Sequence, residues 1–396
     1  MTGSFNPGSP KAVTPAAPAV SRVDARVPAL DGLRGTATVM VVLSHFFGEV
    51  PHGLALFKVG WIAVDVFFVL SGYLVGKLIL ERMHCSNFFT VFYIRRLCRT
   101  VPSYILITCL VYLMFALVDP PKIWMQYEPE FSVWSYVSFT QNFHMAALNE
   151  VGPHWLSPYW TLAVEEHFYL VGPAFLVFVA RRWMVPILVV TAILAVLFRF
   201  YAVVTTEENM FAVVLLPGRM DSLIMGILAA ILVTRDSVDW AKYEVWLRVI
   251  PTIALVATAL LGLFAKGLVI IFGHFIVSFG AAAYILMLVQ GLPESKRMNS
   301  KLLIFFADTS YATYLTHVAV LGTVHGLFLG SLPDIGNLAQ VAVTLIALPV
   351  TVAVGWLLTR YVEMPISAYG RSWKWRELTS QGELTGSTDA HLRNRK

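Results

Sequence analysis

The stretch LDGLRGTATVMVVLSHFF, Leu30 to Phe47, decides the class of this protein, because it opens with charged residues and continues as an apolar run. Arg34 lies near its start and His45 follows eleven positions later, with no ionisable residue between them. A helix needs about 20 mostly apolar residues to cross a bilayer. The stretch therefore predicts a membrane span with a titratable ring deep inside it.

The composition of the whole chain supports this prediction. Of the 396 residues, 57% are hydrophobic and 13% are charged, and the mean hydropathy is +0.69. Soluble domains carry about 25% charged residues, so this chain lacks the polar surface needed to face water. We predict an all-α polytopic membrane protein with about ten transmembrane helices. The expected spans are 33–50, 60–80, 101–118, 161–180, 183–201, 211–233, 246–264, 267–290, 302–328 and 338–359.

Residues outside the spans suggest a simple domain organisation. Residues 1–27 are rich in Pro, Ala and Ser, which predicts a disordered cytoplasmic tail with no secretory leader. A transmembrane domain is expected at 28–369 and a cytoplasmic C-terminal tail at 370–396. The three cysteines lack the spacing of a zinc site, so we expect ordinary thiols and no metal.

The distribution of basic residues predicts the orientation. If the N-terminus is cytoplasmic, 24 of the 29 Lys and Arg residues fall on the cytoplasmic side. The exceptions are Lys58, Lys122, Arg199, Arg219 and Lys266. We therefore expect both termini in the cytoplasm and the protein in the plasma (inner) membrane. The net charge of +5 follows from this bias and does not indicate a nucleic-acid partner.

Arg34 and His45 form the first candidate site. Eleven residues are about three helical turns, roughly 16 Å, and return almost to the starting direction, so both side chains share one face. Ionisable groups at membrane depth indicate function, and histidine can take a proton from a hydroxyl group near neutral pH. The alternative is a packing histidine bonded to a carbonyl or to Ser44, and the sequence leaves both open.

A second candidate lies in FYIRRLCRTVP, at the start of the third span. Arg95 and Arg99 are four residues apart, and Arg96 and Arg99 are three apart, so at least two guanidinium groups point the same way. Arginine binds phosphate in a bidentate manner, which suits a ligand with several phosphates. The alternative is an anchor that follows the positive-inside rule.

A third candidate is YWTLAVEEHFYLVGP, which opens the fourth span. Glu165 and Tyr169 are neighbours on one helix face, and Glu165 lies roughly 8 Å below Trp160. Glu166 projects about 100° away from Glu165, so the two carboxylates are not expected in one cavity. An interfacial aromatic belt explains Trp160 but not two consecutive glutamates.

Weaker signals are interpreted as structural. Asp65 lies among apolar residues and needs a partner such as an arginine, and Ser71-Gly72 allows close helix approach. Arg219 and Asp221 are read as neutralising each other. Further polar positions near the chain's end are Tyr311, Tyr314, His317 and Glu363.

Taken together, these stretches resemble the acyltransferase 3 family of integral membrane O-acyltransferases. The resemblance is carried, in order, by LDGLRG with its arginine–histidine spacing, DVFFVLSGYL, RRLCRTVPSY, WTLAVEEHFYL, RMDSLIMG, and SYATYLTH followed by YVEMP. Together they extend from residue 30 to residue 365. Each motif alone is weak, whereas the ordered set is specific.

The resemblance implies transfer of an acyl group, usually acetyl, from cytoplasmic acyl-CoA to a hydroxyl. The implied acceptors are carbohydrates or lipid-linked glycans of the cell envelope, or a small molecule such as a macrolide. It matches His45 to the family's essential histidine and Arg34 to its motif partner. It further matches Arg96 and Arg99 to the arginine pair, and Glu165 to the glutamate of the fourth span.

These matches lead to a mechanistic expectation. Acyl-CoA is the co-substrate, and its phosphates lie on Arg34, Arg96 and Arg99. His45 acts as general base or carries the acyl group briefly. Glu165 either holds the imidazole tautomer or binds the acceptor. The expected substrate-binding residues also include Arg95, Glu166, Tyr169 and Asp65.

Two departures from the family pattern matter. Ala163 stands where the family often has serine, so a hydroxyl that orients Glu165 must come from elsewhere. The chain after Tyr369 is too short for the SGNH hydrolase-like domain of some members, so a partner or direct transfer is expected. A transporter or flippase is the alternative from another class, and it predicts repeated charged motifs that the later spans lack. The sequence does not predict the oligomeric state.

Overall fold

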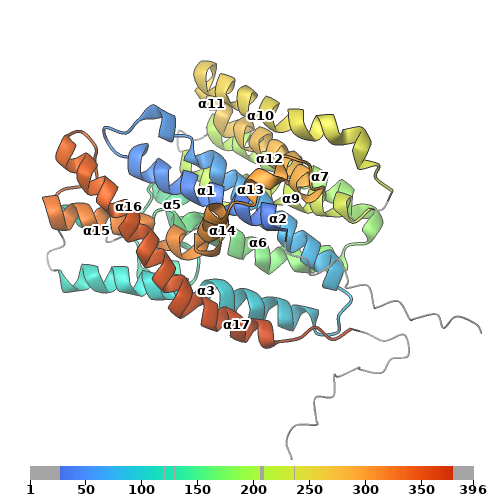
Figure 1. Ribbon diagram of the computed structural model, residues 1–396, viewed down its shortest axis with the longest axis horizontal. Helices are drawn as coiled ribbons and strands as arrows, with labels where there is room; N and C mark the ends of the chain where they lie inside the picture. The colour runs from blue at the N-terminus through green and yellow to red at the C-terminus, as the bar shows by residue number, and fades with distance from the viewer. Residues whose placement is uncertain (1–26, 119–121, 129, 206–208, 236, 378–396) are drawn as a thin grey trace, which may run out of the picture.

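The computed structural model describes residues 27–118, 122–128, 130–205, 209–235 and 237–377, and all the secondary structure in these ranges is helical (Figure 1). Of the tails predicted at 1–27 and 370–396, residues 1–26 and 378–396 lie outside the described residues. Within the predicted C-terminal tail, helix α17 continues to Ser372, and residues 373–377 pack against the start of α3. The helices run largely along the long axis of the molecule.

The structure contains the following α-helices: α1 (Pro28–Phe47), α2 (Gly60–Arg82), α3 (Phe88–Leu117), α4 (Val133–Val137), α5 (Gln141–Leu148), α6 (Tyr159–Phe178), α7 (Arg181–Thr205), α8 (Asn209–Val214), α9 (Met220–Val233), α10 (Glu244–Phe264), α11 (Lys266–Leu268), α12 (His274–Val289), α13 (Ser295–Met298), α14 (Lys301–Asp308), α15 (Ser310–Leu329), α16 (Leu338–Leu358) and α17 (Met364–Ser372). Short 3-10 or π segments are η2 (Ala55–Phe57), η3 (Ile123–Met125), η4 (His154–Leu156), η5 (Leu216–Gly218), η6 (Trp240–Tyr243), η7 (Val269–Gly273) and η8 (Thr359–Glu363).

Eight helical stretches in the described residues are long and apolar enough to cross a bilayer, and they contain α2, α3, α6, α7, α10, α12, α15 and α16. They correspond to eight of the expected spans, so the chain is an all-α membrane protein. The other two expected spans fall on α1 and on the pair α8 and α9. The α9 helix has 14 residues and is shorter than the expected 211–233 span.

Two expected spans are interrupted. The stretch 211–233 breaks at η5, which contains Pro217 and Gly218, and 302–328 breaks between α14 and α15. A break inside the hydrocarbon layer frees backbone carbonyls that lipid cannot satisfy. Arg199 of α7 solves this problem, because its guanidinium donates to the carbonyl of Gly218 and to that of Ile271 in the π segment η7.

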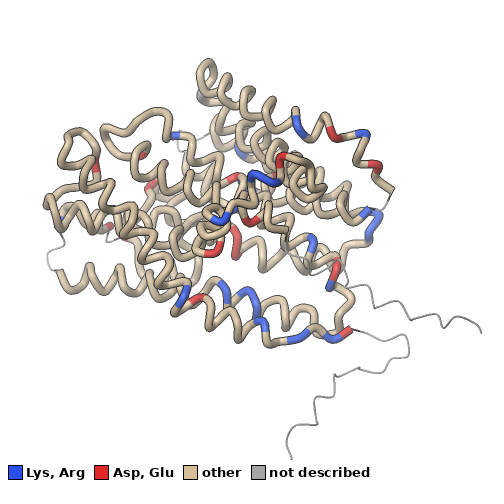
Figure 2. The backbone as a smooth tube through the Cα atoms, in the orientation of Figure 1, with Lys and Arg blue, Asp and Glu red and all other residues tan. Residues whose placement is uncertain are grey.

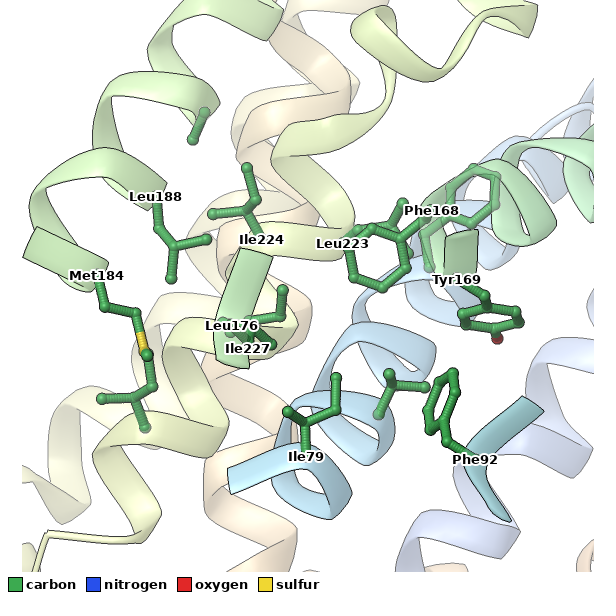
Figure 3. Close-up of a cluster of buried hydrophobic side chains, with 14 of the residues drawn as sticks. Ile79, Phe92, Phe168, Tyr169, Leu176, Met184, Leu188, Leu223, Ile224 and Ile227 are labelled. Atoms are coloured by element: carbon green, nitrogen blue, oxygen red, sulfur yellow. The ribbon is translucent and has the colours of Figure 1, made fainter. Parts of the chain in front are cut away.

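Helices α2 and α9 pack at very short range. A Cβ atom on Gly72 would overlap the carbonyl of Leu223, and one on Gly226 would overlap the carbonyl of Val69. Small residues allow such close approach, which drives helix association where lipid is as apolar as the protein. The contact at Ser71-Gly72 was predicted from the sequence and is confirmed. Beside it, side chains of α2, α3, α6, α7 and α9 form one apolar cluster around Phe168 and Leu223 (Figure 3).

Charged side chains are distributed unevenly along the molecule. Figure 2 shows a row of Lys and Arg residues along the first half of α3, with further basic residues at α17 and at helix ends on the same side. This row contains Arg95, Arg96 and Arg99. The helix α1 begins on this side, so its Arg34 and the arginines of α3 approach each other.

Candidate functional site

Helix α1 connects two cavities at opposite ends of its length. Arg34 lines one of them, named here the arginine cavity, and His45 lines another, named the histidine cavity. The two residues that the sequence placed on one helix face thus each line one of these cavities.

The arginine cavity has a volume of about 140 Å³ and lies between α1, α2, α3, α6 and α15. Its charged lining consists of Arg34, Arg96, Arg99 and Glu165. The guanidinium of Arg96 lies 4.7 Å from the centre of the Tyr169 ring. Three guanidinium groups against one carboxylate give this cavity a net positive charge, which suits phosphate groups.

Arg95 lies outside this cavity, although the sequence grouped it with the other two arginines. Its Nε and Nη2 atoms donate to the carbonyl of Trp373 at 3.2 and 2.7 Å, and its guanidinium lies 4.9 Å from the ring centre of Trp375. Arg95 therefore holds the segment after α17 against α3, and its role in substrate binding stays a prediction.

Glu165 lines the arginine cavity, and a chain of hydrogen bonds holds its carboxylate there. Tyr169 donates to Glu165 Oε2 at 3.0 Å, and the hydroxyl of Ser71 on α2 bonds to the Tyr169 hydroxyl. Because Ala163 provides no hydroxyl, the sequence predicted that one would come from elsewhere. Tyr169 provides it from the next turn of the same helix.

Glu166 is separated from Glu165 as the helix geometry predicted. Thr100 of α3 donates to Glu166 Oε1 at 2.9 Å, so this carboxylate joins α6 to α3. Glu166 does not line any of the three cavities found in the described residues. The structure thus gives Glu166 a helix-joining contact, and its contact with a substrate stays a prediction.

The histidine cavity has a volume of about 310 Å³ and lies where α1 ends and the loop after α15 begins. His45 Nδ1 lies 3.0 Å from the carbonyl of Val41 and 3.3 Å from Nε2 of His317. His317 Nδ1 in turn lies 2.7 Å from the carbonyl of Tyr314. Since carbonyls only accept, each Nδ1 carries hydrogen, and His317 Nε2 is an acceptor.

It follows that neutral His45 has its free lone pair on Nε2. This atom lies 3.5 Å from Glu49 Oε2, and the Glu49 side chain is 49% exposed while that of His45 is 17% exposed. Ser44 donates to the other Glu49 oxygen at 2.9 Å. The site can therefore accept a proton at Nε2 and stabilise the resulting imidazolium. The tautomer is set by Val41 and His317, which leaves acceptor binding as the remaining one of the two roles predicted for Glu165.

Two side chains of α15, Tyr314 and His317, lie between the arginine cavity and His45. Tyr314 lines the arginine cavity, and its ring centre lies 5.6 Å from that of His317, which contacts His45. Its hydroxyl bonds to Thr161 at 2.8 Å. The sequence predicted a continuous path from Arg34 to His45, whereas the structure has two cavities with a barrier at Tyr314, referred to below as the Tyr314 barrier.

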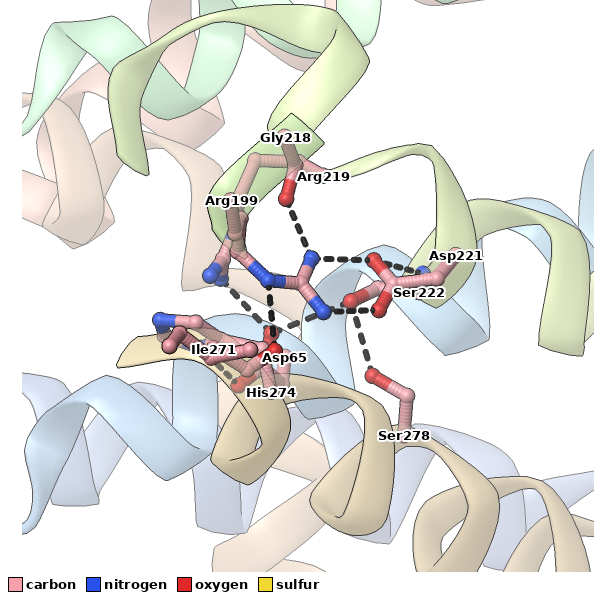
Figure 4. A network of polar contacts seen from close by, with 9 residues as sticks. All are labelled: Asp65, Arg199, Gly218, Arg219, Asp221, Ser222, Ile271, His274 and Ser278. Atoms are coloured by element: carbon pink, nitrogen blue, oxygen red, sulfur yellow. Dashed lines mark hydrogen bonds and ion pairs between the residues drawn. The ribbon is translucent and has the colours of Figure 1, made fainter. Parts of the chain in front are cut away.

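Asp65 belongs to a buried ionic network away from the three cavities (Figure 4). Arg219 donates to Asp65 Oδ1 at 2.6 Å, and His274 Nδ1 lies 2.9 Å from Oδ2. Arg199 bonds Asp221 through both of its terminal nitrogens, at 2.9 and 2.6 Å. Asp65 thus has the arginine partner that the sequence required, and its role in substrate binding stays a prediction. Arg219 and Asp221 do not pair with each other.

Several residues near the chemistry were not selected from the sequence. Glu49 follows His45 by four positions, a helical spacing that could have identified it. His317 and Tyr314 were noted but interpreted as structural. His154 lies in η4 and lines the histidine cavity, as does Gln126, and no local pattern connects either residue to His45.

Comparison with known proteins gives a consistent result. The family model described as "Acyltransferase domain" matches residues 27–360. The chain is 24% identical to "O-acetyltransferase OatA" of Staphylococcus aureus over 375 residues, covering 87% of this chain and 58% of the relative. It is 34% identical to "Peptidoglycan O-acetyltransferase OatA" of Listeria monocytogenes over 164 residues, covering 40% of this chain and 25% of that protein.

The match covers only part of these relatives. This chain spans less than two thirds of the length of the Staphylococcus aureus protein. No solved structure matches the chain significantly.

Proposed function

The chain belongs to the acyltransferase family, and from this membership we propose that it moves an acyl group, acetyl in the simplest case, from acyl-CoA to a hydroxyl of a carbohydrate. The acceptor is proposed to be a cell-envelope or secreted glycan. The name of the Listeria monocytogenes relative supports peptidoglycan as one candidate.

The observation that carries this proposal is the placement of Arg34 and His45 on one helix between two cavities. We assign the arginine cavity to the cytoplasmic side, in line with the positive-inside rule. The phosphates of acyl-CoA then bond Arg34, Arg96 and Arg99. The acceptor hydroxyl enters the histidine cavity from the other side of the membrane.

In the proposed reaction, His45 Nε2 takes the proton of the acceptor hydroxyl while the oxygen attacks the thioester carbonyl. The carbon–sulfur bond breaks, and the thiolate takes the proton back from the imidazolium. Glu49, at 3.5 Å from Nε2, stabilises the charged ring between these steps. Because Tyr314 separates the cavities, its ring must move before the thioester reaches His45.

The test uses purified protein in nanodiscs with labelled acetyl-CoA. His45→Gln should lower transfer by about 10²–10⁴-fold, the usual contribution of a general base, with acetyl-CoA binding retained. Arg96→Ala should weaken acetyl-CoA binding. Arg95→Ala is the matched control, because this arginine lies outside the cavity.

Two results would contradict the proposal. Normal transfer by His45→Gln would exclude the histidine as base. Equal acetyl-CoA affinity of Arg96→Ala and Arg95→Ala would exclude the arginine cavity as the donor site.

A further inference from the structure

Building on the proposed function, we propose that residues 122–128 and 151–154, between α3 and α6, form a groove for a neutral oligosaccharide acceptor. Gln126, just after η3, and His154 of η4 bond hydroxyl groups of the sugar units next to the one that reacts. The groove is thus the proposed determinant of which acceptor the protein binds.

The groove is continuous with the site of His45. A third cavity of about 490 Å³, named the loop cavity, lies between η3 and η4. It shares Gln126, His154 and Leu332 with the histidine cavity. The two are therefore adjacent, and each is within the range of about 300–1,000 Å³ that is usual for ligand sites. A chain of sugar units can thus extend from His45 into the loop cavity.

Two polar atoms in the shared wall have no hydrogen-bond partner among the described residues. They are Nδ1 of His154 and Oε1 of Gln126, and both are buried. An unsatisfied buried polar atom costs about 1–3 kcal/mol, so a site that retains two of them favours a ligand that bonds them. Gln126 is also held at φ 49 and ψ 48, a left-handed conformation that is uncommon for a residue other than glycine.

The chemistry of the walls favours a neutral polyol over an anion. The charged lining of the two cavities consists of Glu49, Glu128 and Lys122, in contrast to the three guanidinium groups of the arginine cavity. Burial, together with the nearby His45, lowers the pKa of His154, so its ring stays neutral at pH 7 and can both donate and accept. Tyr127 adds a partly exposed aromatic ring of the kind that packs on a sugar ring.

Hydrogen bonds between two loops hold the rim of the groove together. The loop after α1 meets the loop after α15, where His52 Nδ1 lies 2.7 Å from Asp334 Oδ2 and its backbone N–H donates to Oδ1 at 3.0 Å. Neighbours of these two residues, Pro51 and Pro333, line the histidine cavity. The rim is thus held independently of Gln126 and His154, so both can be replaced without opening it.

The experiment measures direct binding of two soluble probes, chitotetraose and maltotetraose, to the purified full chain by titration calorimetry. His154→Phe keeps a ring of similar size without nitrogen atoms. Gln126→Asn keeps a residue that tolerates the left-handed backbone but shortens its reach. His144→Phe is the control, because His144 is exposed on α5 in the same connection and lines neither cavity.

Both groove variants should bind the preferred probe at least tenfold more weakly, with the affinity for acetyl-CoA unchanged, whereas the control should match the original chain. Unchanged glycan affinity in both variants, or no binding of either probe to the original chain, would overturn the groove. Glycan binding without acetyl transfer would overturn the proposed enzyme function and leave the groove supported.

Discussion

At the scale of single residues, the chemistry depends on which nitrogen of His45 is free. The carbonyl of Val41 and Nε2 of His317 both face Nδ1, so Nε2 is left for the acceptor. The environment that fixes this tautomer comes from α1 and α15, which are far apart in the sequence. Because the bonds are to backbone and to another ring, a carboxylate partner is not needed to orient the imidazole.

The first prediction concerns Glu49. Glu49→Gln should lower transfer by about fivefold, since a partner that is 49% exposed is screened by water and contributes about 1 kcal/mol to the charged ring. Initial rates at saturating acetyl-CoA measure this effect. Glu150→Gln, an exposed acid in the same half of the chain, is the control. A loss as large as that of His45→Gln would instead make Glu49 the base.

The second prediction concerns the hydroxyl that holds Glu165. In Tyr169→Phe, the carboxylate loses its donor and is free to turn toward Arg96 and Arg99, which reduces the positive charge available to phosphates. The dissociation constant of acetyl-CoA should rise about tenfold, equivalent to about 1.4 kcal/mol.

The matched control for this variant is Tyr93→Phe. The Tyr93 hydroxyl donates to the carbonyl of Leu170, away from the arginine cavity. Equal acetyl-CoA affinity of the two variants would show that the Tyr169 hydroxyl does not affect phosphate binding by Arg96 and Arg99.

Sequence reasoning at this scale succeeded where spacing along one helix decides contact. It separated Glu165 from Glu166, and the structure agrees. It could not pair residues across helices, because nothing in the local sequence encodes which helices become neighbours. Arg219 was therefore matched with Asp221, two residues away, whereas its partner is Asp65, 154 residues away.

At the scale of secondary-structure elements, the interruptions of the spans are as important as the spans. Hydropathy predicted the long apolar runs, because a bilayer demands them. It did not predict the break at η5, although Pro217 and Gly218 are a turn signal, since an average over about 20 residues conceals two of them. It also did not predict that Arg199 would satisfy the carbonyls that the breaks release.

The third prediction follows from this role of Arg199. Arg199→Lys keeps the charge but loses the planar fork that reaches Asp221 and two carbonyls at once. The folded state should lose about 3 kcal/mol or more, as when one partner of a buried pair is removed.

The measurement is the thermal unfolding of detergent-solubilised protein by size-exclusion chromatography. Arg235→Lys, at an exposed position after α9, should unfold at the same temperature as the original chain. Equal unfolding temperatures for both variants would exclude a structural role for Arg199.

At the scale of the whole molecule, the architecture keeps apart the two cavities that we assign to donor and acceptor. The arginine cavity and the histidine cavity approach each other from opposite ends of α1, and Tyr314 with His317 occupies the space between them. Such a barrier protects a thioester from water, because acyl transfer to water competes with transfer to a hydroxyl. The sequence predicted Arg34 and His45 on one helix but not this barrier, since Tyr314 and His317 lie on α15, far from α1 in the sequence.

The last prediction tests this barrier. Tyr314→Ala removes the ring that separates the cavities, so water from the histidine cavity should reach the thioester and release CoA without acceptor. The hydrolysis rate should rise several-fold, whereas Tyr314→Phe, which keeps the ring and loses the bond to Thr161, should stay close to the original rate. Release of free thiol measured with acetyl-CoA alone gives both rates. If Tyr314→Ala binds acetyl-CoA normally but releases no more thiol than Tyr314→Phe, the ring does not separate donor from water, and another element must protect the thioester.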